Sequence, residues 1–125
     1  MNNYQEKLKE KMNQYVHFVY KITKNFPKEE LYGVVSQFRR STLSIILNYI
    51  EGYARKRPLV RLNFLETSYG SLQESKYLLE FSLVEKYLDK KDYIYNINLA
   101  EEIGAMLWKD IDGLEKYIKN RKTIN

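Results

Sequence analysis

The amino-acid sequence predicts an all-α protein, an antiparallel up-down-up-down four-helix bundle formed by a single domain over residues 1–125. Two observations favour this fold. Apolar residues recur at intervals of three and four along four long segments, as they do on the buried face of an amphipathic helix. Only five glycines and two prolines interrupt the chain. A length of 125 residues is enough to bury one hydrophobic core but too short for two independent cores.

The first helix is expected from about Tyr4 to Lys24, and Pro27 then ends the helical pattern. Six apolar residues in this part of the chain are separated by alternating intervals of four and three, which places them on one face. The residues expected on this buried face are Leu8, Met12, Tyr15, Val19, Ile22 and Phe26.

The second helix is expected from about Leu31 to Lys56, and its apolar surface is unusually broad. Its main buried face is expected to hold Leu31, Val35, Phe38, Thr42, Ile45, Tyr49 and Tyr53. The apolar residues that widen this face are Val34, Leu43, Ile46, Leu47 and Ile50. A face this wide predicts that the helix contacts more than one neighbour.

The third helix is expected to begin at Pro58, because the missing N–H of proline would have no partner in the first turn anyway. It should end near Val84. Its expected core residues are Leu62, Leu65, Tyr69, Leu72, Leu79 and Leu83. Another side carries the small residues Ser68, Ser71, Ser75 and Ser82, which would allow a neighbouring helix to approach closely.

The fourth helix has the clearest pattern, with Asp89 as its expected N-cap. Its heptad seam is formed by Tyr93, Ile97, Ala100, Gly104, Leu107, Ile111, Leu114 and Ile118. The polar residues from Lys119 to Asn125 are expected to fray.

Positive charge is concentrated in the segment from Arg39 to Arg61, which nets +5, whereas the other charges of the chain cancel. Arginine has a planar fork of donors that suits phosphate groups. We therefore predict nucleic-acid binding through phosphates, with a merely solvated face as the alternative. The candidate binding residues are Arg39, Arg40, Arg55, Lys56, Arg57 and Arg61. Arg39 precedes Arg55 by about 24 Å along an ideal helix, so one protomer should present two basic spots.

A polar stripe runs along the second helix beside its apolar face. Its members are Gln37, Ser41, Ser44, Asn48 and Glu51, followed by Arg55. One interpretation is a hydrogen-bonded structural network or subunit interface, in which Glu51 and Arg55 pair across one turn. The other interpretation is the lining of a pore or ligand groove. In either case a partner or water must satisfy these polar groups where they are buried.

The sequence offers no basis for an enzyme, a metal site or a cofactor. It contains no cysteine, and its single histidine, His17, is not part of the Glu-x-x-His pairs that di-iron bundles use. His17 is expected at a solvated or boundary position. The polar N-terminal segment and the lack of an apolar run of about 20 residues predict a cytoplasmic protein without a membrane span.

One region of the chain carries a recognisable set of motifs. They are Phe26-Pro27-Lys28-Glu29-Glu30, Tyr32-Gly33, Ser36-Gln37-Phe38-Arg39-Arg40, Ser44-Ile45, Asn48, and Glu51-Gly52-Tyr53 with Arg55. In this order they resemble the signature of the bacterial four-helix-bundle family typified by proteins encoded in 23S rRNA intervening sequences. Relatives typically have proline and alanine where this chain has Ile46 and Leu47, so we expect its second helix to be less kinked.

The resemblance implies a homo-oligomer, a pentameric ring or barrel of bundles, without catalytic residues. A distantly related group, the accessory subunits of diversity-generating retroelements, is similar in fold and basic charge and binds nucleic acid and a reverse transcriptase. We therefore expect a non-enzymatic oligomer that binds RNA or DNA, with a reverse transcriptase as a further partner. The alternative is a structural scaffold that does not bind nucleic acid.

Overall fold

The computed structural model describes the backbone of residues 1–124 and the side chains of residues 1–121. It contains four long helices, which confirms the prediction of an all-α four-helix fold, and the described residues form no strand. The helices are α1 (Asn3–Thr23), α2 (Ser36–Tyr53), α3 (Pro58–Val84) and α4 (Lys90–Ile124). A short 3-10 turn, η1 (Lys28–Glu30), and a π-helical turn, η2 (Leu31–Val35), connect α1 to α2.

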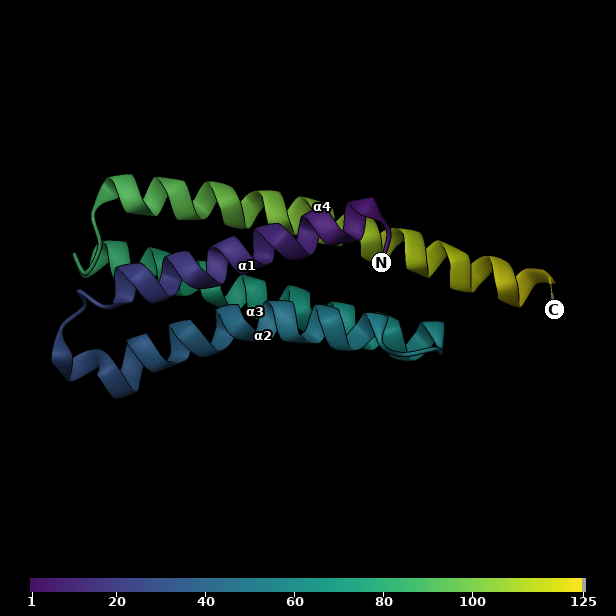
Figure 1. The fold of residues 1–125 in the computed structure, drawn as a ribbon, viewed down its shortest axis with the longest axis horizontal. Helices are drawn as coiled ribbons and strands as arrows, with labels where there is room; N and C mark the ends of the chain where they lie inside the picture. The colour runs from purple at the N-terminus through teal and green to yellow at the C-terminus, as the bar shows by residue number, and fades with distance from the viewer. Residues whose placement is uncertain (125) are drawn as a thin grey trace.

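The chain reverses direction at each connection, as Figure 1 shows. The contacts between helices agree with this antiparallel arrangement. Gln5 near the start of α1 donates to the Tyr53 hydroxyl at the end of α2, whereas Thr23 at the end of α1 accepts from Arg39 near the start of α2. Along α4, Tyr95 stacks on Phe18, and the later residue Met106 accepts from Tyr4. The helices therefore form a ring in which α1 and α3 each contact α2 and α4.

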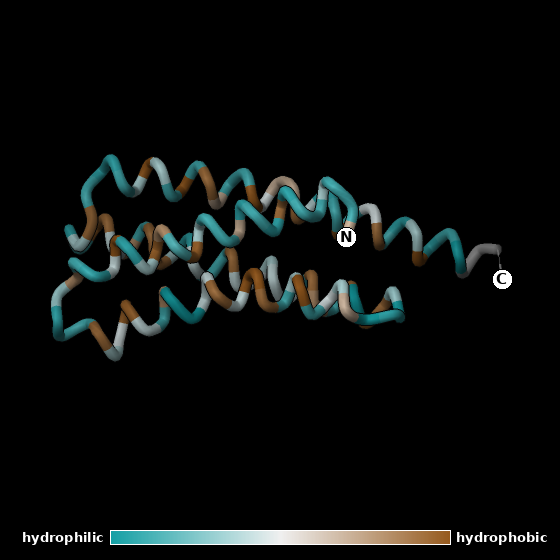
Figure 2. The backbone as a smooth tube through the Cα atoms, in the orientation of Figure 1, coloured by the Kyte–Doolittle hydropathy of each residue, from teal (hydrophilic) through white to brown (hydrophobic). Residues whose placement is uncertain are grey.

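The predicted core is largely confirmed. All six residues expected on the inner face of the first helix are buried, although Phe26 lies just after the end of α1. Five of those expected on the second helix are also buried, Val35 in η2 and Phe38, Thr42, Ile45 and Tyr49 in α2. Figure 2 shows hydrophobic residues recurring between hydrophilic ones along the helices. The fold therefore follows from the spacing of apolar residues.

Two parts of the prediction for the second helix are wrong. Leu31 is exposed, because it lies in η2, where the non-helical backbone of Gly33 (φ −111°, ψ −108°) offsets this turn from α2. The α-helix begins at Ser36 and ends at Tyr53, three residues before Lys56. From Ser36 onward α2 is one uninterrupted helix.

The broad apolar face of α2 is covered only in part. Leu43, Leu47 and Ile50 are exposed, with Leu47 at 54% relative accessibility. These three residues follow intervals of four and three, so they form one apolar stripe along the outside of α2. We call them the α2 stripe.

The ends of α4 differ in how well they match the prediction. Asp89 accepts from the backbone N–H of Asp92 at 2.7 Å, so it is the expected N-cap. The helix then continues to Ile124, although an irregular end was expected from Lys119; Asn125 lies outside the described residues. Arg121 contacts the Tyr117 ring one turn earlier, a pairing that supports the helix in this segment.

Small residues bring α2 and α3 close together. The Ser68 hydroxyl donates to the Ile45 carbonyl at 2.7 Å, and the Ser44 and Ser71 hydroxyls are 2.9 Å apart. A Cβ atom added at Gly52 would lie only 3.1 Å from the Phe64 Cβ. The close approach of the two helices therefore depends on side chains with little bulk.

No helix in the described part of the chain combines the length and the apolar character that crossing a bilayer would require.

The packing at Gly52 generates a prediction for Gly52→Ala. The new methyl group would also lie 3.3 Å from the backbone oxygen of Arg61, and neither neighbour can rotate away. We expect the free energy of unfolding to fall by about 1 kcal/mol or more, as overpacking generally causes. Thermal and urea unfolding followed by circular dichroism would measure it.

Gly70→Ala is the matched control, because Gly70 is exposed within α3 and a Cβ there meets no atom within 4 Å. It should stabilise the protein by about 0.5–1 kcal/mol through helix propensity alone. Equal effects of the two substitutions would show that α2 and α3 do not pack closely at Gly52.

Candidate nucleic-acid interface

The turn between α2 and α3 occupies residues 54–57 and is closed by Arg61. The Arg61 Nε donates to the Gly52 carbonyl at 3.2 Å, and its Nη2 donates to the Arg55 carbonyl at 2.8 Å. The Gly52 carbonyl lies in the last turn of α2 and also accepts from the Arg55 N–H at 3.2 Å, whereas the Arg55 carbonyl lies beyond the helix. Arg61 therefore fixes the conformation of the turn.

The aromatic residues beside the turn hold two of the predicted arginines in place. The Arg61 guanidinium lies 4.9 Å from the centre of the Tyr53 ring, and the Arg55 guanidinium lies 5.3 Å from the Phe64 ring. Arg55 also forms the expected ion pair with Glu51. Both guanidiniums are thus oriented by contacts within the chain.

Lys56 and Arg57 lie between these two arginines in the sequence and are exposed. Arg57 is the N-cap residue of α3, with extended backbone (φ −82°, ψ 125°), and it makes no side-chain capping bond. The turn therefore presents two exposed cations on a backbone that Arg61 holds in place.

The other two predicted basic residues lie at the opposite end of α2, so the chain presents two basic spots (Figure 1). The Arg39 Nε donates to the Thr23 hydroxyl at 2.9 Å, and its Nη2 donates to the Tyr20 carbonyl at 3.4 Å. Its guanidinium also lies 4.7 Å from the Tyr20 ring. The Arg39 side chain is therefore held at the end of α1 by these contacts, whereas Arg40 is exposed.

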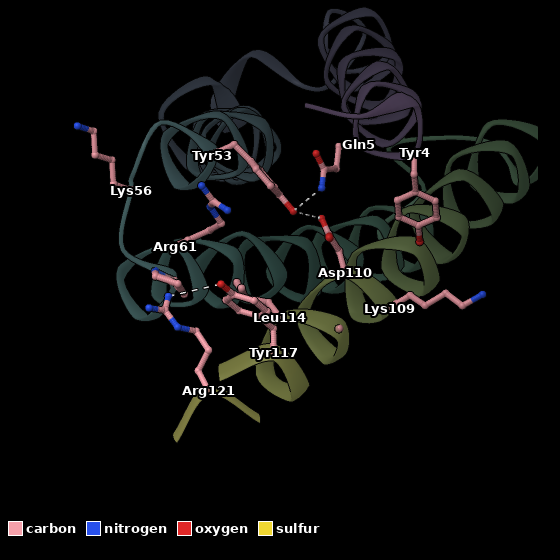
Figure 3. A pocket seen from close by; sticks show the side chains of 12 residues that line it. Tyr4, Gln5, Tyr53, Lys56, Arg61, Lys109, Asp110, Leu114, Tyr117 and Arg121 are labelled. Atoms are coloured by element: carbon pink, nitrogen blue, oxygen red, sulfur yellow. Dashed lines mark hydrogen bonds between the residues drawn. The ribbon is translucent and has the colours of Figure 1, made fainter. Parts of the chain in front are cut away.

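A cleft of about 540 Å³ opens beside the α2–α3 turn. It is formed by the start of α1, the turn, the start of α3 and the C-terminal part of α4 from Lys109 to Arg121 (Figure 3). Beyond this part α4 projects past the turn (Figure 1). The lining of the cleft comprises Tyr4, Gln5, Tyr53, Lys56, Pro58, Arg61, Lys109, Asp110, Gly113, Leu114, Tyr117 and Arg121. We call this the turn cleft.

The turn cleft combines basic residues that the sequence analysis identified with others that it missed. Lys56 and Arg61 were predicted, whereas Lys109 and Arg121 come from α4, where acidic residues balance the basic ones. One signal in the sequence could have indicated these two residues as part of a site. The fourth helix is longer than the other three, and Tyr117 and Arg121 lie four residues apart near its end.

Asp110 is the one carboxylate among the described residues that line the turn cleft. It accepts from the Tyr49 hydroxyl at 2.6 Å and from the Tyr53 hydroxyl at 2.7 Å, and both bonds end on Oδ2. The Tyr53 oxygen in turn accepts from Gln5 Nε2 at 3.1 Å, so these bonds join α1, α2 and α4. Figure 3 shows Asp110 beside Tyr53 and Gln5.

These contacts keep both phenols protonated. Burial raises the pKa of Tyr49 far above its ordinary value of 10.0, and the hydrogen bond and the negative charge of Asp110 raise it further. The pKa of Tyr53 is raised in the same way, first by burial and then by Asp110. Tyr49 and Tyr53 are therefore stable hydrogen-bond donors to the carboxylate.

The polar stripe of α2 is bonded within the chain. The Ser41 hydroxyl donates to the Phe38 carbonyl, and Asn48 donates to the Ser44 carbonyl and hydroxyl at 2.8 and 2.9 Å. Ser44 also contacts Ser71 of α3. Gln37 is exposed and lines a groove of about 420 Å³ between the η1–η2 connection, α2 and α3. Within one protomer the stripe is mainly a structural network.

The described residues contain no group of three or more histidine, cysteine, aspartate or glutamate side chains placed to hold a metal ion. His17 is exposed on α1, as expected.

Comparisons with known proteins give a consistent result. A family model described as 23S rRNA-intervening sequence protein matches residues 5–109. A crystal structure of a protein with unknown function from the S23 ribosomal protein family of Bacteroides thetaiotaomicron VPI-5482 superimposes with a TM-score of 0.81. The two sequences are 22% identical, and the match covers 87% of this chain and 98% of the Bacteroides chain. This likeness shows the fold. No curated protein matches the sequence.

The contact between Tyr49 and Asp110 generates a prediction for Tyr49→Phe. The substitution removes a hydrogen bond to a charged group, so at neutral pH the free energy of unfolding should fall by about 1.5–3 kcal/mol. The variant should, however, lose less stability than the wild-type protein as the pH rises above 10. The reason is that the Tyr49 phenol ionises near its ordinary pKa of 10.0 only in the unfolded chain, which favours unfolding at alkaline pH.

Urea unfolding at a series of pH values up to about 11 would measure both effects, in a range that brackets the ordinary tyrosine pKa. An unchanged alkaline loss in Tyr49→Phe would show that Tyr49 ionises equally in the folded and unfolded protein.

Proposed function

Because the chain belongs to the 23S rRNA-intervening sequence protein family, we propose that it is a non-enzymatic homo-oligomer that binds RNA or DNA through phosphate contacts. The description of the family names no catalytic activity, so the proposal rests on surfaces rather than on reactive side chains.

The observation that carries the nucleic-acid part is the gathering of cations at one end of the bundle. Lys56 and Arg57 are exposed on the turn, and Lys109, Arg121 and Arg61 border the turn cleft beside them. Separate segments thus contribute to one positive region. Phosphates of a nucleic acid release condensed counterions when such cations neutralise them, which drives binding without sequence preference.

Two apolar areas on different sides of the bundle support self-association. One is the α2 stripe, whose Ile50 lines, together with Ile46, the α2 side of a groove of about 510 Å³ between α1 and α2. On α3 and α4, the exposed Trp108 packs against Tyr69 at 5.5 Å beside a second groove of about 350 Å³. Two different apolar areas on different faces suit a head-to-tail contact. In such a contact one area of each subunit packs against the other area of its neighbour, and the subunits close into a ring.

We propose five subunits, the number that the family resemblance implies. A ring would repeat the cations of the turn around its rim and so raise the local potential beyond that of one chain with a net charge of +5. The proposed protein partner is a reverse transcriptase, which follows from the distant resemblance to retroelement accessory subunits.

The nucleic-acid proposal predicts the behaviour of the double variant Lys56→Glu with Arg57→Glu. Neither side chain forms a hydrogen bond or ion pair within the described part of the protomer, so the fold should be unchanged. We expect the affinity for a structured RNA or duplex DNA to fall at least tenfold at low salt. The slope of log affinity against log salt should become shallower by about two, one for each lost phosphate contact. Fluorescence anisotropy over a salt series would measure both.

A matched control is the reversal of Lys90 and Lys91, two adjacent exposed lysines at the start of α4, at the other end of the bundle. This variant should bind within about twofold of the wild-type protein. If the wild-type protein forms a stable oligomer but binds neither RNA nor DNA at low salt, the scaffold alternative is correct.

The oligomer proposal predicts that Leu47→Glu reduces the mass of the particle. A charge in the middle of the α2 stripe would be desolvated without a partner in the interface, so the subunits should dissociate while helix content is retained. Light scattering coupled to size exclusion would measure the mass. Val84→Glu is the control, because Val84 is exposed at the end of α3 and away from both apolar areas. Retention of the full mass in Leu47→Glu would exclude this face as an interface.

A further inference from the structure

The turn cleft has the size of a site for one small ligand. Its volume of about 540 Å³ falls in the range of roughly 300–1,000 Å³ that is typical of such sites. One unit of a single-stranded nucleic acid fits this volume, whereas a duplex does not enter it. The turn cleft is therefore distinct in kind from the exposed cations of the turn, which can contact any phosphate backbone.

The guanidiniums of Arg61 and Arg121 retain donors for a phosphate. Arg61 uses Nε and Nη2 on the carbonyls of the turn, and its Nη1 takes no part in these bonds. Among the described residues, the Arg121 guanidinium lies 5.7 Å from the centre of the Tyr117 ring, and its Nη1 donates over a long 3.4 Å to the Tyr117 hydroxyl. In Figure 3 these two arginines lie on the same side of the turn cleft, and Lys56 and Lys109 extend outward on opposite sides.

Asp110 sets a second requirement on the ligand. Both tyrosine bonds end on its Oδ2, and Oδ1 takes no part in them, so Oδ1 can accept one further hydrogen bond. A carboxylate repels phosphate and attracts a donor. The sugar–phosphate backbone of DNA has no hydrogen-bond donor within a strand, whereas every ribose of RNA carries a 2′-hydroxyl.

Tyr117 provides an aromatic surface at the rim. Its side chain is 51% exposed, and its ring belongs to the C-terminal part of α4 that lines the turn cleft. Exposed tyrosine rings can stack on unpaired bases with little preference for the base.

We infer that the turn cleft binds one ribonucleotide unit of a single-stranded RNA, with its phosphate on Arg61 and Arg121 and its 2′-hydroxyl donating to Asp110. This inference rests on the proposed nucleic-acid binding and adds a preference for RNA over DNA.

The test compares single-stranded oligonucleotides of one sequence and three sugars, RNA, 2′-fluoro RNA and DNA, by fluorescence anisotropy with the wild-type protein. The 2′-fluoro sugar keeps the phosphates and bases but cannot donate. RNA should bind about tenfold more tightly than 2′-fluoro RNA, the loss expected for one hydrogen bond to a charged group. Equal affinities for RNA and 2′-fluoro RNA overturn the inference and leave the proposed function intact. Failure of all three oligonucleotides to bind overturns the inference, and it overturns the proposed function as well if structured RNA and duplex DNA also fail to bind.

Two variants locate the effect. In Asp110→Asn the tyrosine hydrogen bonds can be kept, but the charged acceptor is lost. The ratio of the affinity for RNA to that for 2′-fluoro RNA should therefore fall toward one. A ratio that stays near ten in a folded variant overturns the role of Asp110. If that variant does not fold, the comparison of sugars with the wild-type protein still decides the inference.

Arg121→Ala should weaken the binding of single-stranded RNA several-fold. The control is Lys116→Ala on the same helix, because Lys116 lies outside the turn cleft and pairs with Asp112. Equal effects of these two substitutions would mean that the cations of α4 act only through their general charge, and would overturn the phosphate position.

Discussion

The close approach of α2 and α3 is the constraint on which the basic end of the molecule depends. Gly52 leaves no room for a side chain against Phe64, and Ser68 bonds directly to the backbone of α2. The helices can then be joined by only four residues, 54–57, and Arg61 of α3 donates to the carbonyls of Gly52 and Arg55. The same packing that closes the core thus determines where the cations of the turn lie.

Asp110 provides the second constraint, because it attaches α4 to the end of α2 through Tyr49 and Tyr53. This attachment places the C-terminal part of α4 beside the turn and so forms the turn cleft. One carboxylate therefore supports the fold with one oxygen and offers the other oxygen to a ligand. Changes in the ligand are accordingly more informative than changes in Asp110, because they leave the fold untouched.

The sequence predicted the helices and the core well because both depend on local spacing, as the six buried positions predicted between Leu8 and Phe26 show. It failed at Leu31, because the backbone at Gly33 changes the helical register in a way that spacing does not reveal. It predicted the cations of the turn but not their partners on α4. The proximity of Lys109 and Arg121 to the turn is a tertiary contact between residues far apart in the sequence, and their charges are balanced by nearby acids. Nor could it show that Arg39 bonds to the end of α1 or that Arg61 bonds to the carbonyls of the turn.

The central claim is that RNA is held at the end of the bundle formed by the α2–α3 turn and α4. Ultraviolet cross-linking of a bound single-stranded RNA, followed by identification of the modified tyrosines by mass spectrometry, tests this claim most directly. We expect cross-links at Tyr117 and Tyr4, which line the turn cleft. Tyr32 is 93% exposed at the opposite end of the bundle, so exposure alone would favour it. Cross-links concentrated at Tyr32, with none at Tyr117, would contradict the claim.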